Sequence, residues 1–225
     1  MSTRSKLWDW PTRLFHWLLA LSLCGSWLTA ELGLDYMDLH FQLGYFALGL
    51  VLFRILWGLW GTHFARFRQF VKGPRAVFSD LKSFTKRDNT SQHVGHTAAA
   101  GWSILVLLSL VGIQAGSGLF VNDDIMFAGP YNPAVSSDLA GQLAYIHHTN
   151  FNVLQGFVLL HILTVLWYQF GKRRNLIQPM ITGYTELHVD QDIAGFWIRA
   201  LLSMALSAGA IWLLLYLAPE PSLYY

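Results

Sequence analysis

Long apolar runs are the feature of this sequence that most restricts its fold. A segment needs about 20 predominantly apolar residues to cross the hydrocarbon core of a bilayer as a helix. Five runs among the 225 residues meet this requirement, at about 14–33, 40–61, 98–121, 146–170 and 194–217. Backbone polar groups inside a bilayer must be satisfied within the segment itself, so these runs predict an all-α integral membrane protein with five transmembrane helices.

The composition agrees with this prediction and excludes several other classes of protein. Hydrophobic residues make up 54% of the chain and charged residues 12%, about half of the charged fraction of a typical soluble domain. The chain is therefore neither disordered, nor a basic nucleic-acid-binding protein, nor a soluble single-core enzyme. The single cysteine, Cys24, excludes an intrachain disulfide, a cysteine-ligated zinc or iron–sulfur centre, and covalent haem attachment through C-x-x-C-H.

Basic and acidic residues are divided sharply between the two sides of the predicted membrane. All 15 Lys and Arg residues fall in or beside the segments 1–13, 62–97 and 171–193, which lie on one side. The segments on the other side carry only acidic residues, namely Glu31, Asp35, Asp38, Asp123, Asp124, Asp138 and Glu220. The positive-inside rule then predicts a cytoplasmic N-terminus and a periplasmic C-terminus in a bacterial inner membrane.

The basic segment 62–97 allows two interpretations. Pro74 is typical of a helix start, and Val77, Leu81 and Phe84 recur at helical spacing. The basic residues on the other face are Arg75, Lys82, Lys86 and Arg87. This pattern predicts an amphipathic helix on an anionic lipid surface, and the alternative is a solvated basic loop.

Histidines carry the most specific chemical signal, because a histidine inside a membrane span is costly and usually functional. Four of the nine lie in or at the ends of predicted spans: His16, His40, His161, and one of His147 and His148. By helix geometry, His147 and His161 are about 21 Å apart along the axis but only about 40° apart around it. His148 is about 140° from His161 around the same helix, so we expect His147 to share the face of His161.

Membrane depth pairs these histidines. His16 and His161 are expected near the cytoplasmic surface, and His40 and His147 near the periplasmic surface. Two bis-histidine sites follow, and non-covalent haem takes imidazole axial ligands in an apolar pocket between facing helices. Zinc is a weaker alternative because catalytic zinc usually has three protein ligands in one place. A proton relay is also weaker, because the span interiors contain no carboxylate.

Three residues near the histidines suit a haem pocket. Arg54 lies fourteen residues after His40, which puts it on the same helix face at cytoplasmic depth, where a guanidinium can bind a propionate. Arg13, three residues before His16, suits the same role. Gly44, four residues after His40, would let a porphyrin approach the backbone, and the alternative is small-residue helix packing.

Several motifs occur in order along the chain. They are Trp8-Asp9-Trp10-Pro11-Thr12-Arg13-Leu14-Phe15-His16-Trp17, His40-Phe41-Gln42-Leu43-Gly44-Tyr45 with Arg54, Gly73-Pro74-Arg75, Gly118-Leu119-Phe120 with Asp123-Asp124 and Gly129-Pro130, and His147 with His161. In this order and spacing, residues 6–174 resemble the bacterial cytochrome b561 and nickel–iron hydrogenase b-type cytochrome family.

The resemblance implies a four-helix core at 1–174 that binds two b haems and exchanges electrons with quinone. Carried over residue by residue, it implies His16 and His161 as axial ligands of the inner haem, and His40 and His147 as those of the outer haem. These are the four histidines reached from helix geometry. The chain departs from compact members in its last part, 175–225, which adds an inner linker and a fifth helix without a ligand candidate.

Three further residues are candidates for contact with quinone. His93 and His96 lie three apart at the start of the third span with no obvious third metal ligand, so we expect a structural pair or a quinone contact. Arg199, near the inner end of the fifth run, suits a quinone or a lipid headgroup.

Electron transfer between the quinone pool and a periplasmic redox partner is the leading functional hypothesis. The acidic outer segments would steer a basic c-type cytochrome electrostatically. The equally favoured alternative is that their charge has no role in binding a partner. One alternative is a membrane anchor and electron-transfer subunit of a larger periplasmic hydrogenase or reductase. Another, implied by compact family members, is a superoxide:quinone oxidoreductase, which the lack of outer basic residues disfavours. A haem-free scaffold or transporter has no support from a broken-helix pair or a midplane charge.

Overall fold

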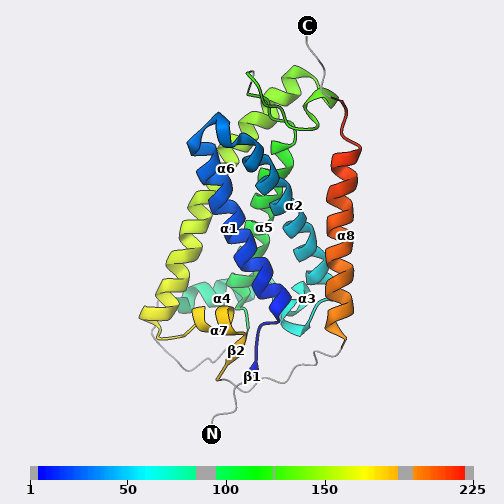
Figure 1. The fold of residues 1–225 in the computed structure, drawn as a ribbon. Coiled ribbons are helices and arrows are strands. Elements are labelled where there is room, and N and C mark those ends of the chain that lie inside the picture. The colour runs from blue at the N-terminus through cyan, green and yellow to red at the C-terminus, as the bar shows by residue number, and fades with distance from the viewer. Residues whose placement is uncertain (1–4, 85–94, 124, 187–194, 221–225) are drawn as a thin grey trace. The chain divides into compact units, whose positions relative to one another are not determined.

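The computed structural model describes residues 5–84, 95–123, 125–186 and 195–220. Within these residues, five long helices dominate: α1 (Trp10–Leu32), α2 (Met37–Trp60), α5 (Ala98–Gly118), α6 (Ser137–Leu166) and α8 (Phe196–Tyr216) (Figure 1). The short helices are η1 (Leu34–Tyr36), η2 (His63–Ala65), α3 (Phe67–Phe70), α4 (Pro74–Phe84), η3 (Asn132–Ala134) and α7 (Ile177–Thr182). A π-helical turn, η4 (Trp167–Gly171), follows α6, and the strands β1 (Ser5–Lys6) and β2 (Tyr184–Thr185) pair antiparallel.

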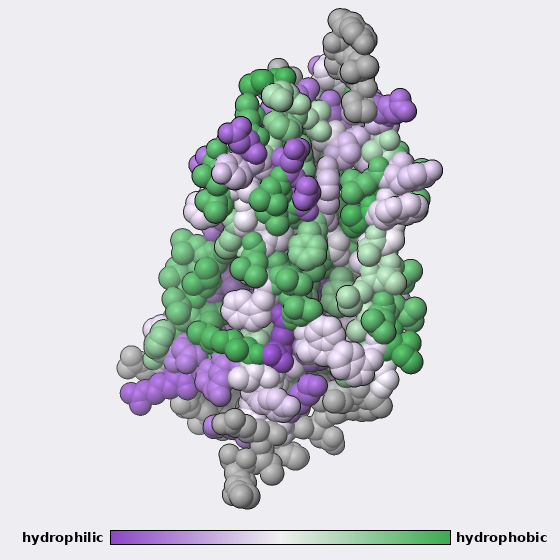
Figure 2. Space-filling model, in the orientation of Figure 1, coloured by the Kyte–Doolittle hydropathy of each residue, from purple (hydrophilic) through white to green (hydrophobic). Residues whose placement is uncertain are grey.

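Four helical segments in the described part of the chain are long and apolar enough to cross a bilayer. They are Leu34–Trp60, Ala98–Gly118, Ser137–Gly171 and Phe196–Tyr216, and they overlap the predicted runs 40–61, 98–121, 146–170 and 194–217. The chain is therefore a multi-pass membrane protein, and the surface seen over α6 and α8 in Figure 2 is largely apolar, as a lipid-facing surface is. The predicted first span, 14–33, coincides with α1, whose membrane crossing stays a prediction.

Helix α6 begins nine residues before the predicted fourth span. The predicted span starts at about residue 146, whereas the helix starts at Ser137. Its first turn is polar, with the Leu139 N–H donating to the Ser136 hydroxyl at 3.3 Å and Asp138 beside the helix start. These residues satisfy and complement a helix N-terminus, so the helix extends beyond its apolar part.

Within the basic segment 62–97, the residues Pro74–Phe84 form the predicted amphipathic helix, α4, rather than an irregular loop. The Asp80 carboxylate accepts the Ala99 N–H at 3.1 Å, and the Ser83 carbonyl accepts the Lys172 ammonium at 2.9 Å. Phe78 is 66% exposed, so it is available to lipid. Binding to anionic lipid stays a prediction, and Lys86 and Arg87 lie outside the described residues.

The chain forms two compact units, each assembled from three stretches of sequence. Unit 1 contains Met1–His16, Arg54–Leu107 and Phe157–Ser203, and unit 2 contains Trp17–Phe53, Leu108–Gly156 and Met204–Tyr225. All 15 Lys and Arg residues of the sequence belong to unit 1. Unit 2 has no Lys or Arg and seven acidic residues, the same seven that the sequence assigns to the outer side. The sequence predicts a different division, into a four-helix core at 1–174 and an added part at 175–225, and that division stays a prediction.

A buried carboxylate organises unit 1. Asp9 is 2% exposed, and its Oδ1 accepts the Thr12 N–H at 2.6 Å, which caps the start of α1. Its Oδ2 accepts the indole N–H of the fully buried Trp57 at 3.2 Å, and also the Thr62 hydroxyl. These bonds join the start of α1 to the end of α2, one turn after Arg54.

The N-terminal strand is held by the segment that follows α7. Ser5 pairs with Thr185 and Lys6 with Tyr184, and the Gly183 carbonyl accepts the N–H groups of Leu7 and Trp8 at 2.8 and 3.2 Å. Gly183 has φ 88°, a left-handed conformation that ends α7 and that glycine adopts without strain. Strands of two residues carry no periodic pattern, so the sequence did not predict this pairing.

We predict that Asp9→Ala destabilises the protein, because it removes the α1 cap and leaves the buried Trp57 N–H and Thr62 hydroxyl without this acceptor. The loss should be on the order of 2 kcal/mol or more. Thermal unfolding in detergent measures it, with Asp138→Ala, an exposed first-turn residue of α6, as the matched control. Equal melting temperatures for the two variants would contradict the organising role of Asp9.

Candidate functional site

Unit 1 brings together one of the two predicted histidine pairs. His16 on α1 and His161 on α6 are 145 residues apart in the sequence, yet their ring centroids lie 6.4 Å apart with the planes at 53°. Both rings are partly buried. The same unit contains the buried Arg54, which lies beside the aromatic rings of Phe67 and Phe70.

Unit 2 brings together the second pair. The ring centroids of His40, in the first turns of α2, and His147, on α6, are also 6.4 Å apart, with the planes at 73°. His148 is exposed, and it is His147 that faces His40. This is the side of α6 that helix geometry selects from the two adjacent histidines.

Backbone carbonyls fix both rings in unit 2. Nδ1 of His40 lies 2.8 Å from the Ser26 carbonyl oxygen, and Nδ1 of His147 lies 2.9 Å from the Gln114 carbonyl oxygen. A carbonyl can only accept, so Nδ1 carries the proton in each ring and donates it. Nε2 then keeps its lone pair, which is the arrangement of a histidine that ligates a metal ion.

The ring spacing fits two histidines on opposite sides of one metal ion. A ligating imidazole nitrogen lies about 2 Å from its metal and about 1.1 Å from its own ring centroid, so two opposed rings have centroids about 6.2 Å apart. Both observed separations are 6.4 Å. Among the described residues no group of three or more His, Cys, Asp or Glu is placed to hold a metal ion. Two imidazoles at this separation suit the axial positions of a haem, whose macrocycle supplies the other ligands.

Arg54 is a second feature that fits an anionic cofactor. It is 3% exposed, and its Nη1 has no hydrogen-bond acceptor among the described residues. The guanidinium lies 4.8 Å from the Phe67 ring centroid and 5.9 Å from that of Phe70. Asp9 supplies negative charge nearby, but its oxygens already accept three hydrogen bonds. A buried cation with an open donor suits a propionate.

The guanidinium of Arg13 binds backbone carbonyls of α7. Its Nε donates to the Met180 carbonyl at 3.3 Å and its Nη2 to the Ile181 carbonyl, so it binds the last turn of α7. Basic side chains commonly satisfy carbonyls at a helix C-terminus. The predicted contact of Arg13 with a propionate gains no support from these bonds.

Two glycines shape the site in unit 2. A Cβ at Gly44 would meet no heavy atom within 4 Å, so there is open space beside α2 one turn after His40. A Cβ at Gly118 would lie 3.0 Å from Cε1 and 3.2 Å from Nδ1 of His147. Gly44 thus leaves room next to the histidine pair, and Gly118 leaves room for the His147 ring itself.

His96, one of the quinone candidates, packs in unit 1 against aromatic rings. Its ring centroid lies 4.5 Å from that of Trp8 and 4.9 Å from that of Phe70. Burial, then the positive charge of Arg54 and the proximity of His161, lowers the pKa of His96 to about 3, so the ring is neutral at pH 7. His93 lies outside the described residues.

Arg199 has a packing role. Its Nη1 donates to the Trp60 carbonyl at 2.9 Å and to the Gly61 carbonyl at 3.4 Å, which ties the start of α8 to the end of α2. The indole N–H of Trp60 donates to the Ser203 hydroxyl at 2.8 Å in the same contact. A contact of Arg199 with quinone stays a prediction.

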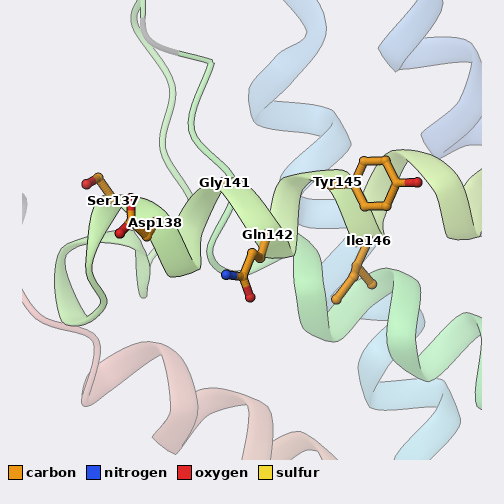
Figure 3. A pocket seen from close by; sticks show the side chains of 6 residues that line it. All are labelled: Ser137, Asp138, Gly141, Gln142, Tyr145 and Ile146. Carbon is orange, nitrogen blue, oxygen red and sulfur yellow. The ribbon is translucent and has the colours of Figure 1, made fainter.

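A surface pocket of about 610 Å³ lies on another face of α6. Figure 3 shows its lining residues, Ser137, Asp138, Gly141, Gln142, Tyr145 and Ile146, along the first turns of the helix. These positions centre about 170° around the helix from His147. The pocket is therefore distinct from the histidine pair.

Comparison with protein families identifies the chain. A family model described as prokaryotic cytochrome b561 matches residues 7–183. The chain belongs to the prokaryotic cytochrome b561 family. Membership implies haem b binding and electron transfer in a membrane. The match contains all four paired histidines and Arg54, continues through α7 to Gly183, and ends before α8. Comparisons with curated proteins and with solved structures found no match.

Sequence reasoning missed the groups of this b561-family protein that orient the rings. The Ser26 and Gln114 acceptors are backbone carbonyls, which any residue type provides. Asn150, which is buried, donates to the Leu110 carbonyl at 2.9 Å and to the Gln114 side chain at 2.8 Å. Polar residues such as Asn150 and Gln114 inside apolar runs are a signal that could have marked this support.

We predict that His147→Ala and His161→Ala each remove about one haem per chain, because each deletes one member of a pair. His148→Ala should leave the haem content unchanged, since His148 is exposed and the ring that contacts His40 is that of His147. The pyridine haemochrome assay on purified variants measures both effects. Haem loss from His148→Ala with retention in His147→Ala would reverse the assignment.

We also predict that Gly118→Val weakens haem binding in unit 2, because the new side chain displaces the His147 ring from the Gln114 carbonyl. Loss of such an orienting contact costs on the order of tenfold in affinity. Haem transfer to an apoprotein scavenger measures the dissociation rate. Gly116→Val is the matched control, because a Cβ there meets no atom within 4 Å. Equal rates for both variants would argue against the packing role of Gly118.

Proposed function

We propose that this protein is a di-haem b-type cytochrome that passes single electrons between membrane quinone and a soluble redox partner in the periplasm. The proposal rests on the two histidine pairs, one in each unit, with the same 6.4 Å ring separation. Bound haem supplies reversible one-electron chemistry at its iron. The protein supplies ligands, orientation and charge.

Each pair would hold one haem. His16 and His161 are the proposed axial ligands in unit 1, and His40 and His147 those in unit 2. The Nδ1–H bonds of His40 and His147 to backbone carbonyls would keep both rings in the ligating tautomer. Open space beside Gly44 supports the presence of a flat ring system next to the second pair.

The membrane arrangement proposed is five spans with the N-terminus in the cytoplasm of a bacterial cell. The division of charge supports it, because every basic residue belongs to unit 1 and unit 2 has none. The haem of unit 1 would then be the inner one and the haem of unit 2 the outer one. The aromatic surroundings of His96, which include Trp8 and Phe70, make this part of unit 1 the proposed quinone site.

An electron-transfer subunit of a larger periplasmic enzyme is the second candidate. One observation favours it: α8 lies outside the family match, which leaves a whole helix that family members need not share. Co-purification of a catalytic subunit under mild detergent conditions would distinguish this candidate. Superoxide oxidation is disfavoured, because unit 2 offers an anion no Lys or Arg.

We predict that quinol reduces the purified holoprotein and that a basic soluble cytochrome c reoxidises it.

Arg54→Gln should lower the midpoint potential of one haem, because a buried positive charge favours the reduced, more negative state. Arg54→Lys keeps the charge and should shift the potential less. Spectroelectrochemical titration measures these potentials. An unchanged pair of potentials in Arg54→Gln would contradict the placement of this guanidinium beside a haem.

The function itself is tested by stopped-flow spectroscopy of the Soret band. Reduction by quinol followed by reoxidation by the carrier is the expected result. A haem-loaded protein that quinol reduces but no soluble carrier reoxidises would favour the subunit candidate. A protein that quinol does not reduce would contradict the quinone part of the proposal.

A further inference from the structure

One carboxylate accepts several backbone N–H groups in the loop between α5 and α6. Oδ1 of Asp123 accepts the backbone N–H groups of Ile125, Met126 and Phe127, each at 2.9 Å. Asn122 and Ala128 form an isolated antiparallel bridge, and the Asp123 N–H donates to the Phe127 carbonyl at 3.1 Å. The backbone N–H bonds lower the pKa of Asp123, so it is ionised at neutral pH.

This loop presents two large apolar side chains, Ile125 and Met126, which we call the apolar tip. Ile125 is 73% exposed, and Met126 is 77% exposed, the highest value for a large apolar residue in the described part of the chain. The tip lies between α5 and α6, outside the segments apolar enough to cross the membrane. Contact with the hydrocarbon core therefore does not account for its exposure, and the two adjacent side chains offer a small apolar contact area to a partner.

The tip is connected to the histidine pair of unit 2 by aromatic contacts. Phe127, next to the tip, lies 6.4 Å from Phe41 between ring centroids, and Phe41 lies 6.4 Å from His40. A protein docked on the tip would thus stand two ring contacts from a proposed haem ligand. Electron transfer needs such proximity and no large interface, and weak redox complexes lie at the small end of the range of specific interfaces.

The acidic residues of unit 2 indicate the charge that a partner should carry. Asp35 and Asp38 are exposed and precede His40 by five and two residues. Unit 2 as a whole has seven acidic residues and no Lys or Arg. Complementarity then requires a partner with basic residues around an apolar contact area, and opposite charge raises the association rate.

We propose that the apolar tip is the docking site for a small soluble haem protein with a basic face. The proposal rests on the proposed function and names the site where its periplasmic partner binds. One electron passes per encounter: one haem iron is oxidised from ferrous to ferric and the other is reduced from ferric to ferrous. No bond forms or breaks and no proton moves.

The test measures binding and electron transfer separately, on haem-loaded protein in zwitterionic nanodiscs so that lipid charge does not attract the carrier. The probe is a basic mitochondrial-type cytochrome c. The double variant Ile125→Ser/Met126→Ser removes the tip without changing the charge. Leu139→Ser is the matched control, an exposed apolar residue on α6 of the same unit. Asp35→Asn/Asp38→Asn tests the acidic surroundings.

We expect the tip variant to weaken carrier binding about tenfold, measured as Kd by biolayer interferometry, with a similar fall in the second-order electron-transfer rate. The Leu139 control should bind as the wild type does. The aspartate variant should reduce the dependence of the association rate on salt. Haem content and spectra should be the same in all four proteins.

Two results would overturn the docking site. Unchanged Kd and rate in the tip variant, with weaker binding in the aspartate variant, would show non-specific electrostatic attraction. Weaker association of the tip variant with lipid, with unchanged carrier binding, would show that lipid covers the tip. In either case, the proposed function would still stand if the wild-type protein exchanges electrons with quinol and carrier. Absence of haem in the wild-type protein would instead contradict the proposed function itself.

Discussion

Burial of imidazole rings in pairs is the constraint on which the rest of the structure depends. Each pair joins two helices distant in sequence, and α6 contributes one histidine to each. An imidazole in an apolar environment needs a partner for each ring nitrogen. In unit 2 backbone carbonyls of α1 and α5 satisfy Nδ1 of His40 and His147, which leaves Nε2 for a metal. The fold around this pair therefore leaves Nε2 of His40 and Nε2 of His147 as the ring atoms available to a metal.

Unit 1 combines its histidine pair with buried charge. The Asp9 cluster fixes the start of α1 relative to the end of α2, and Arg54 occupies the same part of α2 between aromatic rings. A guanidinium in such surroundings is expensive unless an anion compensates it. Asp9 supplies part of that compensation, and a haem propionate would supply the rest, so the buried arginine and the histidine pair both fit the same cofactor.

The sequence predicted those features that follow from helix period and hydrophobic length. Four apolar runs coincide with membrane-length helices, and the 100° rotation per residue distinguished His147 from His148. It could not predict what tertiary contacts decide. The position of Arg13 beside His16 predicts a contact with a propionate, which stays a prediction, and no local pattern indicates that its guanidinium also donates to carbonyls of α7, 167 and 168 residues away in sequence. The β1–β2 pairing and the ring-orienting carbonyls are likewise set by long-range contacts that leave no local pattern.

The most direct measurement is near-infrared magnetic circular dichroism of the oxidised wild-type protein, combined with its haem-to-polypeptide ratio. The position of the near-infrared charge-transfer band of low-spin ferric haem reports the identity of its two axial ligands. We expect two haems per chain, both with bis-imidazole ligation. A single haem, a high-spin haem with an open axial position, or no haem in protein produced with ample haem supply would contradict the two histidine sites.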